Sequence, residues 1–414
     1  MTTYNIIIIG AGIAGLAAAI SLRHPTRRIL LLEQSPLSTE IGATISLQPN
    51  ASKLVARWGV SDLLAPLAMT DTAFSVYDLS GSLKTHVSLS SSMGTYGAER
   101  MIYHRQDLHA VLRERATSVE YEGLPAEVWV GKRVVGVDCE EGVVEISDGE
   151  TVRGDLIIGA DGIKSVTRGY VLGKEVAARL TGWSAYRMMV EMEDLVQDEA
   201  FVKVVDPRVS RTVMVVGDRR RMVMGPARGG KVYSVVALVP DEMGEGGGKG
   251  TSWVTKGDRG KMLDTFGDFP DWARAPLRLA QGEIGLWQLR DLDPLETWCK
   301  GRVILIGDSA HAMLPTQGQG GSQAIEDAEA LGALFRELGG DEEGGGRWKR
   351  EDVERINQEV FECRYERATT IQAYSRLAGG EDERAKVAMN PAEFMDYNCL
   401  YEGAIDWRRR QVVV

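Results

Sequence analysis

The chain has 414 residues, of which 44% are hydrophobic and 26% are charged, and its formal net charge is −11 at pH 7. This length supports a large core and favours two interlocked domains. The acidic balance, without a basic patch among aromatic residues, argues against nucleic-acid binding. No apolar run reaches the roughly 18 residues that a membrane-spanning helix needs, so we expect a cytoplasmic protein without a membrane span, either a monomer or a homodimer.

The cysteine and histidine positions predict neither a disulfide framework nor a metal site. The four cysteines, Cys139, Cys299, Cys363 and Cys399, are far apart and form no C-x-x-C pair. Such spacing is typical of a protein from a reducing compartment. The five histidines form no pair at helical spacing, so we expect no bound metal.

The N-terminal region reads as alternating strands and helices. YNIIIIG at residues 4–10 predicts a buried strand, the following GAGIAGLAAAISLRH predicts a turn and a helix, and RRILLLEQ at 27–34 predicts a second strand. Together they form a βαβ unit of about 30 residues. Two further helices are expected at 50–60 and 104–116.

The middle of the chain is rich in predicted strands. Short β-like segments fill residues 127–160, and alternating segments dominate 180–290, which favours an antiparallel sheet that forms its own layer. An apolar strand and a helix return near residue 300, and the part after about 348 is helical and polar. The nucleotide-binding part is therefore expected to be discontinuous in sequence.

We predict an α/β fold with a Rossmann-like nucleotide-binding domain, an inserted, mostly antiparallel β-sheet domain for the substrate, and a C-terminal helical region. The expected ranges are 1–70, 97–178 and 285–340 for the nucleotide-binding domain, 71–96 and 179–284 for the sheet domain, and 348–414 for the helical region.

A glycine motif follows the first strand. Gly10, Gly12 and Gly15 form G-x-G-x-x-G between a strand and a helix, where glycines permit a tight turn, approach of a diphosphate and close helix packing. Glu33 closes the second strand, where a carboxylate binds ribose hydroxyls. An acid at this place favours NAD or FAD over NADP; a glycine turn without a ligand is the alternative.

Two more segments indicate which dinucleotide binds. Residues 154–168 read GDLIIGADGIKSVTR, and residues 302–311 read RVILIGDSAH. With the glycine motif and HRQDLH at 104–109, these segments resemble the three signatures of the class A FAD-dependent aromatic hydroxylases, the salicylate and p-hydroxybenzoate hydroxylase group, and the details resemble fungal members. The resemblance extends to about residue 340 and implies that the nucleotide-binding domain is an FAD-binding domain of the p-hydroxybenzoate hydroxylase type.

The family resemblance implies a reaction. NADPH or NADH transiently reduces FAD, O₂ forms a hydroperoxide at flavin C4a, and an OH group passes to an electron-rich aromatic or polyketide-like small molecule of secondary metabolism. The cofactor carries out the difficult step, and the protein orients the partners and excludes water. No separate nicotinamide motif is expected, because members of this family bind the reductant transiently.

The resemblance also implies residue roles around the FAD. Arg105 would lie along the cofactor, although an arginine at a helix start can simply face solvent. Ala43 and Thr44 match a segment beside the flavin, with Thr44 in place of a common glycine. Asp161 would order the D-G loop near the diphosphate, with a plain Asx turn as the alternative.

The loop at 307–321, GDSAHAMLPTQGQGG, would form the floor of the flavin site. Asp308 would accept hydrogen bonds from the ribityl chain. Pro315 would fix a carbonyl near the reactive C4a–N5 edge, and Gly320 and Gly321 would offer backbone N–H groups to the N1–C2=O edge, where reduction places negative charge. His311 is expected to be structural.

On the substrate side, Arg187 is the candidate catalytic residue. Fungal members often carry an arginine on the first strand of the substrate sheet, facing the flavin and holding an ionised phenol or carboxylate; an outward-facing arginine is the alternative. Where the family often has a tyrosine, this chain has Gly225, so Tyr233 or Tyr186 could act instead, or phenol activation could differ. Residues 393–407 loosely resemble an aromatic closing segment that could cover the pocket.

Hydroxylation is the predicted activity, and several alternatives stay open. Epoxidation or Baeyer–Villiger oxygenation would use the same flavin chemistry. A non-hydroxylating flavoenzyme is less favoured, because none of the nine tryptophans lies in a W-x-W-x-I-P halogenase motif. An FAD-binding protein without turnover is the third class, and the intact loop at 307–321 argues against it.

Overall fold

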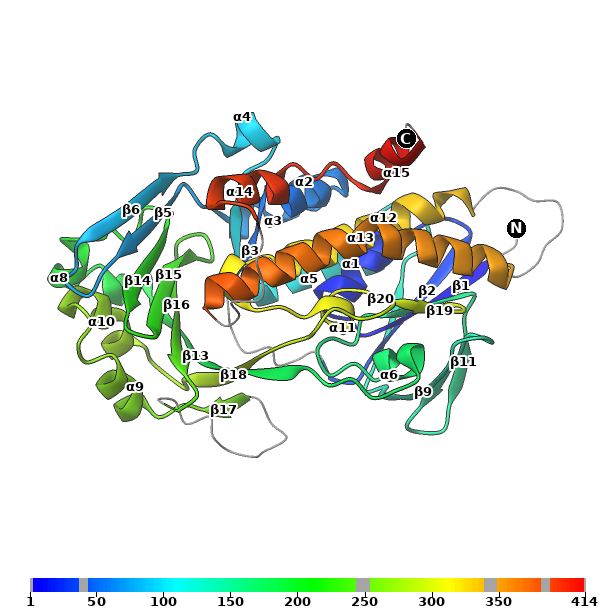
Figure 1. The fold of residues 1–414 in the computed structure, drawn as a ribbon, viewed down its shortest axis with the longest axis horizontal. Coiled ribbons are helices and arrows are strands. Elements are labelled where there is room, and N and C mark those ends of the chain that lie inside the picture. The colour runs from blue at the N-terminus through cyan, green and yellow to red at the C-terminus, as the bar shows by residue number, and fades with distance from the viewer. Residues whose placement is uncertain (1–2, 37–43, 243–253, 339–347, 381–387, 413–414) are drawn as a thin grey trace.

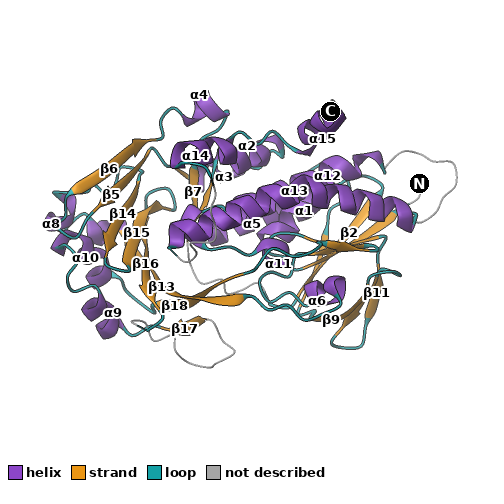
Figure 2. Cartoon of the chain, in the orientation of Figure 1, coloured by secondary structure: helices purple, strands orange, loops and turns teal. Residues whose placement is uncertain are grey.

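Two large sheets lie at opposite ends of the molecule, and a long helix runs between them (Figure 1). The computed structural model describes residues 3–36, 44–242, 254–338, 348–380 and 388–412. Figure 2 shows helices gathered along one side of the smaller sheet and against the outer face of the larger one.

The first sheet has six strands in the order β19-β20-β12-β1-β2-β8, and all neighbours are parallel except β19 and β20. Its strands are β1 Tyr4–Ile9, β2 Arg27–Glu33, β8 Glu127–Val130, β12 Leu156–Gly159, β19 Cys299–Lys300 and β20 Val303–Leu305. Their runs of isoleucine, leucine and valine suit strands covered on both faces. The carboxyl ends of β1, β12 and β20 carry the three predicted motifs, so the sheet brings these motifs to one edge.

The second sheet has eight strands in the order β17-β18-β13-β16-β15-β14-β5-β6, antiparallel except for β14 with β5. Its strands are β5 Ala73–Tyr77, β6 Leu83–Ser88, β13 Arg179–Glu191, β14 Thr212–Gly217, β15 Arg220–Ala227, β16 Val232–Pro240, β17 Val254–Lys256 and β18 Gly285–Asp291. One face packs against short helices in a buried core of methionine, valine and aromatic side chains. The other face turns toward the six-stranded sheet and its helices (Figure 1).

Two three-stranded sheets complete the strands: β3 Thr44–Leu47, β4 Met69–Thr70 and β7 Met101–His104 in one, and β9 Val134–Asp138, β10 Val143–Ile146 and β11 Thr151–Arg153 in the other. The helices before the second large sheet are α1 Ile13–Leu22, α2 Pro49–Arg57, α3 Ser61–Leu64, α4 Ser92–Tyr96, α5 Arg105–Thr117 and α6 Thr167–Leu172. Those that follow are α7 Met192–Leu195, α8 Glu199–Val202, α9 Arg259–Thr265, α10 Asp271–Leu279, α11 Asp308–His311, α12 Gly320–Leu334, α13 Arg350–Gly379, α14 Pro391–Cys399 and α15 Ala404–Val412. Short 3-10 turns lie at η1 Ala65–Leu67, η2 Pro315–Gln317 and η3 Phe335–Glu337.

The fold agrees with the expected α/β class and with a C-terminal helical region. The predicted strands at 4–10 and 27–34 appear as β1 and β2, and the predicted helices at 50–60 and 104–116 appear as α2 and α5. Strand β18 starts at residue 285, the expected start of an FAD-domain segment, and pairs with β13 in the larger sheet. The three domain ranges stay a proposal. Within the described ranges, no helix combines the length and apolar character that crossing a bilayer requires.

Candidate active site

The glycine motif turns the chain between β1 and α1. Gly10 has φ +101°, and a Cβ atom there would lie 2.4 Å from the Ala160 carbonyl oxygen; a Cβ on Gly15 would lie 2.0 Å from the Gly10 carbonyl oxygen. Both positions therefore require glycine for packing. A Cβ on Gly12 would meet no atom within 4 Å. Open space beside Gly12 at a helix N-terminus, where amides lack intrahelical acceptors, suits an incoming diphosphate.

Glu33 braces this loop from the end of β2. Its Oε2 accepts a hydrogen bond from the Ala11 amide at 2.9 Å, and its Oε1 accepts one from the Ser35 amide at 2.8 Å. A carboxylate has about four acceptor positions. The predicted contact with a ribose thus remains open to it while the carboxylate holds the glycine loop.

Asp161 organises the D-G loop after β12. Its carboxylate accepts hydrogen bonds from the Ser165 hydroxyl at 2.6 Å, the Val166 amide at 2.8 Å, and both the amide and hydroxyl of Thr167 at 3.0 Å. These bonds shape the loop that leads into α6. Ala160, the preceding residue, touches Gly10, so the D-G loop and the glycine motif lie side by side.

A cavity of about 790 Å³ opens along the D-G loop and α6. Its charged lining residues are Lys164, Arg168, Lys174, Glu175, Arg290 and Lys300. Five of these six side chains are cationic, so the cavity favours an anionic ligand.

The third motif brings Asp308 to the same edge. Gly307 has φ +60°, and a Cβ there would lie 2.9 Å from the Ala14 side chain, so glycine lets the loop after β20 approach α1. Asp308 follows as the first residue of α11, with an exposed side chain. The glycine motif, the D-G loop and Asp308 therefore come together at one edge of the six-stranded sheet.

The side chain of Asp308 is exposed, and nearby protein atoms partly desolvate its carboxyl. This desolvation raises the pKa of the carboxyl, while the charges of His311, Arg105 and Arg168 act in the opposite direction. An exposed acceptor side chain next to cations suits the hydroxyls of a polyol chain.

The loop after α11 approaches β3. Pro315 is exposed and opens η2, where the Thr316 hydroxyl donates to the Ser375 carbonyl at 2.6 Å. Gly320 begins α12, and a Cβ there would meet only the Met313 side chain, at 3.9 Å. Gly321 instead packs against β3, because its Cβ would lie 2.7 Å from the Ile45 side chain. The start of α12 is therefore open beside Gly320 and packed against β3 at Gly321.

Thr44 links this region to the large sheet. Its hydroxyl lies 3.0 Å from the Ser234 hydroxyl on β16. Ala43, the other residue predicted beside the flavin, lies outside the described residues.

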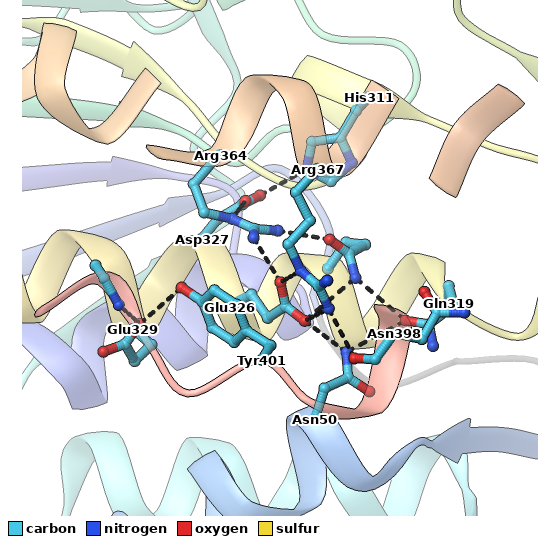
Figure 3. A network of polar contacts seen from close by, with 12 residues as sticks. Asn50, His311, Gln319, Glu326, Asp327, Glu329, Arg364, Arg367, Asn398 and Tyr401 are labelled. Carbon is cyan, nitrogen blue, oxygen red and sulfur yellow. Dashed lines mark hydrogen bonds and ion pairs between the residues drawn. The ribbon is translucent and has the colours of Figure 1, made fainter. Parts of the chain in front are cut away.

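Behind the loop, a buried ion network joins α12 to α13 and the C-terminal segment (Figure 3). Arg364 donates to Asp327 at 2.9 Å, to Glu326 and to Gln323, while Arg367 donates to Glu326 at 2.7 and 2.8 Å. Glu326, Asp327 and Arg364 have no exposed side-chain surface. Arg367 also donates to the backbone carbonyls of Tyr397 and Asn398.

The network contacts the loop at residues 307–321, called the flavin loop below, at two points. Asp327 accepts from the Gly307 amide at 2.9 Å and lies 2.6 Å from Nε2 of His311. Asn50 donates to Glu326 and, at 3.3 Å, to Gln319 directly before α12. In Figure 3, the contacts of Arg364, Arg367 and His311 meet at Glu326 and Asp327 on α12, while Gln319 lies apart, directly before the helix. The network therefore fixes both ends of the loop, and His311 has the internal partners expected of a structural residue.

Charge balance keeps the network ionised. Burial opposes ionisation of Asp327, but His311 and Arg364, with hydrogen bonds from His311 and Gly307, lower the pKa of its carboxyl to about 2. Burial likewise acts to lower the pKa of Arg364, yet Glu326 and Asp327 raise it well above its ordinary value. Each buried charge has its counter-charge.

Arg187 lies on the face of the large sheet that turns toward the flavin loop. Side chains alternate along β13: Tyr186 and Met188 enter the core with the outer helices, so Arg187 points the other way. Val236 is its neighbour on β16, and Ser234, two positions along on the same face, contacts Thr44. Leu314 of the flavin loop packs on the same face with Ala185, Leu238 and Leu289.

The Arg187 guanidinium lacks a counter-ion among the residues that the structure describes. Its Nε is buried without a hydrogen-bond partner, and the centre of the Trp287 ring lies 4.9 Å from the guanidinium carbon. Burial, with the charge of Arg105, lowers the pKa of Arg187 to about 10. The charge of Arg105 therefore acts on two groups, Asp308 after the six-stranded sheet and Arg187 in the eight-stranded sheet.

The two tyrosines considered as substitutes lie on the wrong side. Tyr186 and Tyr233 are 0% and 1% exposed and belong to the core behind the sheet. At Gly225, a Cβ would lie 3.0 Å from the Arg211 carbonyl oxygen, so a tyrosine would need a backbone shift. Neither tyrosine therefore faces the side of the sheet on which Arg187 lies.

The geometry fits FAD. A side chain at Gly12 or Gly320 would meet little or no obstruction at the starts of α1 and α12, and the exposed carboxylate of Asp308 begins the adjacent helix α11. Sequence reasoning missed Asp327, Arg364 and Trp287. The adjacent acids Glu326-Asp327 in an otherwise apolar helix were a usable signal for the network, whereas nothing local marks Trp287.

Comparisons with known proteins agree with this geometry. A family model described as FAD binding domain matches residues 3–345. Hispidin-3-hydroxylase of Neonothopanus nambi is 31% identical over 342 residues, which are 80% of this chain and 80% of that protein. The FAD-dependent monooxygenase cfoG of Aspergillus candidus is 32% identical over 391 residues, 92% of this chain and 86% of that protein. A salicylate hydroxylase in complex with its substrate has a TM-score of 0.75 at 27% identity, over 99% of this chain and 96% of that one.

Proposed function

We infer the substrate of this chain from its family and its site: the chain belongs to the FAD binding domain family and is an FAD-dependent monooxygenase. We propose that it hydroxylates an electron-rich aromatic or polyketide-like small molecule that carries an acidic group. The proposed reductant is NADPH or NADH. One oxygen atom of O₂ enters the product, and the other leaves as water as the dinucleotide is oxidised.

The observation that carries the proposal is the unpaired Arg187. Arg187 is half-buried and its Nε is buried without an acceptor, so an anionic ligand that supplies the missing counter-charge would bind there favourably. The neighbouring Arg105 adds a second positive charge. Both support a phenolate or carboxylate on the substrate, as the name of the salicylate hydroxylase neighbour also suggests.

The chain's own residues would hold the reactants. FAD, when bound, supplies two-electron reduction and activation of O₂. Gly12 and the start of α1 would receive the diphosphate, Asp308 the ribityl hydroxyls, and the amides of Gly320 and Gly321 the negative charge that reduction places on the flavin edge. Arg187 would orient the substrate from the opposite side, and Leu314 with its neighbours would exclude water.

We place the dinucleotide reductant at the cavity along the D-G loop. Its lining of five cations and one acid suits a diphosphate. The change Lys300→Glu should raise KM for NADPH several-fold at unchanged kcat, because it acts on binding alone. An unchanged KM would place the reductant elsewhere.

The test uses the purified, yellow holoenzyme with a panel of hydroxylated aromatic acids and the matching methyl esters. We expect at least one acid to accelerate NADPH or NADH oxidation, with one atom of ¹⁸O from ¹⁸O₂ in the product, and esters to act weakly. Stimulated oxidation with only hydrogen peroxide as product would favour an FAD-binding protein without productive turnover. A ketone converted to an ester would favour Baeyer–Villiger oxygenation. A protein that cannot be loaded with FAD would contradict the proposal altogether.

We further propose a cytoplasmic location, because the four cysteines are unpaired and three of them are buried thiols.

A further inference from the structure

Arg187 rests on an aromatic ring that a neighbouring glycine makes room for. On β18, Gly285 lies opposite Arg187, and Trp287, two residues on, lies opposite Ala185. All four side-chain positions are on the face turned toward the flavin loop, since residues two apart on a strand share a face. The guanidinium carbon of Arg187 lies 4.9 Å from the centre of the Trp287 ring.

The indole occupies the place of a side chain at position 285. A Cβ atom on Gly285 would lie 2.1 Å from Cζ3 and 2.3 Å from Cη2 of Trp287. Any other residue at 285 would therefore displace the ring. Trp287 itself is only 9% exposed, so the ring has little freedom to move aside.

The contact with Trp287 leaves the N–H groups of the Arg187 guanidinium available to a ligand. A ring within about 6 Å of an arginine attracts the guanidinium through the ring's π electrons and takes up none of its N–H groups in a hydrogen bond to oxygen. In this protein Nε is buried without an acceptor, and no hydrogen bond is formed by the guanidinium within the described part of the chain. A planar pair of oxygens can accept two parallel N–H groups from such a fork.

We propose that Trp287, seated on Gly285, is a positioning residue that holds Arg187 to receive a planar two-oxygen anion, an aromatic carboxylate or its vinylogous equivalent. The inference rests on the proposed function and narrows its substrate class. A simple phenolate offers one oxygen and would gain less from the fixed fork.

The experiment measures binding to FAD-loaded protein through the change in flavin absorbance, with 2-hydroxybenzoate, 2,4-dihydroxybenzoate and their methyl esters as probes. In Trp287→Leu we expect the dissociation constants of the acids to rise about tenfold, a loss between those of an exposed and a fully desolvated cation–π contact. Those of the esters should change less than about twofold. Trp287→Phe should restore most of the acid affinity, and Gly285→Ala should behave like Trp287→Leu.

Two matched variants control for general damage. Trp129→Leu removes a ring with Lys132 placed 5.7 Å from its centre, in the other sheet. Gly94→Ala adds a methyl group to a helical glycine where no atom lies within 4 Å. Neither should alter acid binding, and the FAD content of every variant is read from the same spectra.

The outcomes separate the two levels of inference. Equal losses for acids and esters in Trp287→Leu, or acid affinity that survives both Trp287→Leu and Gly285→Ala, would overturn the positioning role while wild-type acid binding stands. If wild-type protein binds none of the acids, the proposed substrate class fails and the positioning role fails with it.

Discussion

Two arginines lie inside this protein in opposite electrostatic settings. Arg364 on α13 is completely buried and bonded to Glu326, Asp327 and Gln323, and these acids raise its pKa well above the ordinary value. Arg187 on β13 has a ring beneath it and no counter-ion among the described residues, and its pKa is lowered to about 10. The same side chain is thus satisfied in one place and unsatisfied in the other.

The difference shows which of the two arginines already has its counter-charges within the protein. The network around Arg364 needs no ligand, so breaking it should harm the fold. The surroundings of Arg187 lack a negative charge, so removing this arginine should harm ligand binding and leave the stability of the fold nearly unchanged. Changes at the two places should therefore differ strongly in their effect on the free energy of unfolding.

The largest effect is expected for Glu326→Ala. This change removes a counter-charge that Arg364 and Arg367 share. Breaking a buried ion pair in this way lowers the free energy of unfolding by about 3–5 kcal/mol. Denaturant unfolding of the apoprotein measures it. Glu141→Ala, which removes an exposed ion pair with Arg153, should cost less than about 1 kcal/mol. Equal effects of the two changes would mean that the network adds nothing special.

A smaller effect on the free energy of unfolding is expected in the glycine motif, where the tightly packed Gly15 lies close to Gly12, which borders open space. Gly15→Ala places a methyl group against the Gly10 carbonyl and should lower the free energy of unfolding by roughly 2–3 kcal/mol. Gly12→Val points into open space and should leave apoprotein stability within about 1 kcal/mol while FAD affinity falls. Differential unfolding and FAD titration check both. Normal FAD affinity in Gly12→Val would remove the diphosphate from this loop.

The acid side of the stability curve sharpens the same contrast. The pKa of Asp327 is about 2 in the folded protein, against an ordinary 3.8, so its contribution is fully present above pH 4 and is lost as the pH falls toward 2. This contribution is about 2 kcal/mol. In Asp327→Asn the drop in stability between pH 4 and pH 2 should be smaller by that amount. An unchanged acid slope would mean that Asp327 titrates normally.

The sequence revealed the local parts of this site and missed the distant ones. Gly10, Gly15 and Glu33 lie within one βαβ unit, where the spacing along the sequence determines which residues are in contact. The alternation around Arg187 predicts that it and Tyr186 face opposite sides, but not which side is the core. The buried side depends on which helices cover the sheet, and the sequence does not determine this. In the structure, Tyr186 and Tyr233 lie in the core between the sheet and its outer helices.

The long-range pairs could not be read from the sequence. Asp327 and Arg364 are 37 residues apart on different helices. Trp287 and Arg187 are 100 residues apart, and their contact depends on the register between β18 and β13, with a break in pairing between Leu180 and Ser184. Register follows from packing of the whole sheet, which a single strand does not encode.

The most direct test of the account compares Arg187→Leu with the wild type. Because Arg187 is half-buried and has no counter-ion among the described residues, this change should leave the free energy of unfolding of the apoprotein within about 1 kcal/mol of the wild type. The same variant, loaded with FAD, should bind 2-hydroxybenzoate and 2,4-dihydroxybenzoate at least about 30-fold more weakly, as expected for the loss of a charge-assisted pair. Loss of several kcal/mol of stability with unchanged affinity for these acids would contradict it, because Arg187 would then be a structural residue like Arg364.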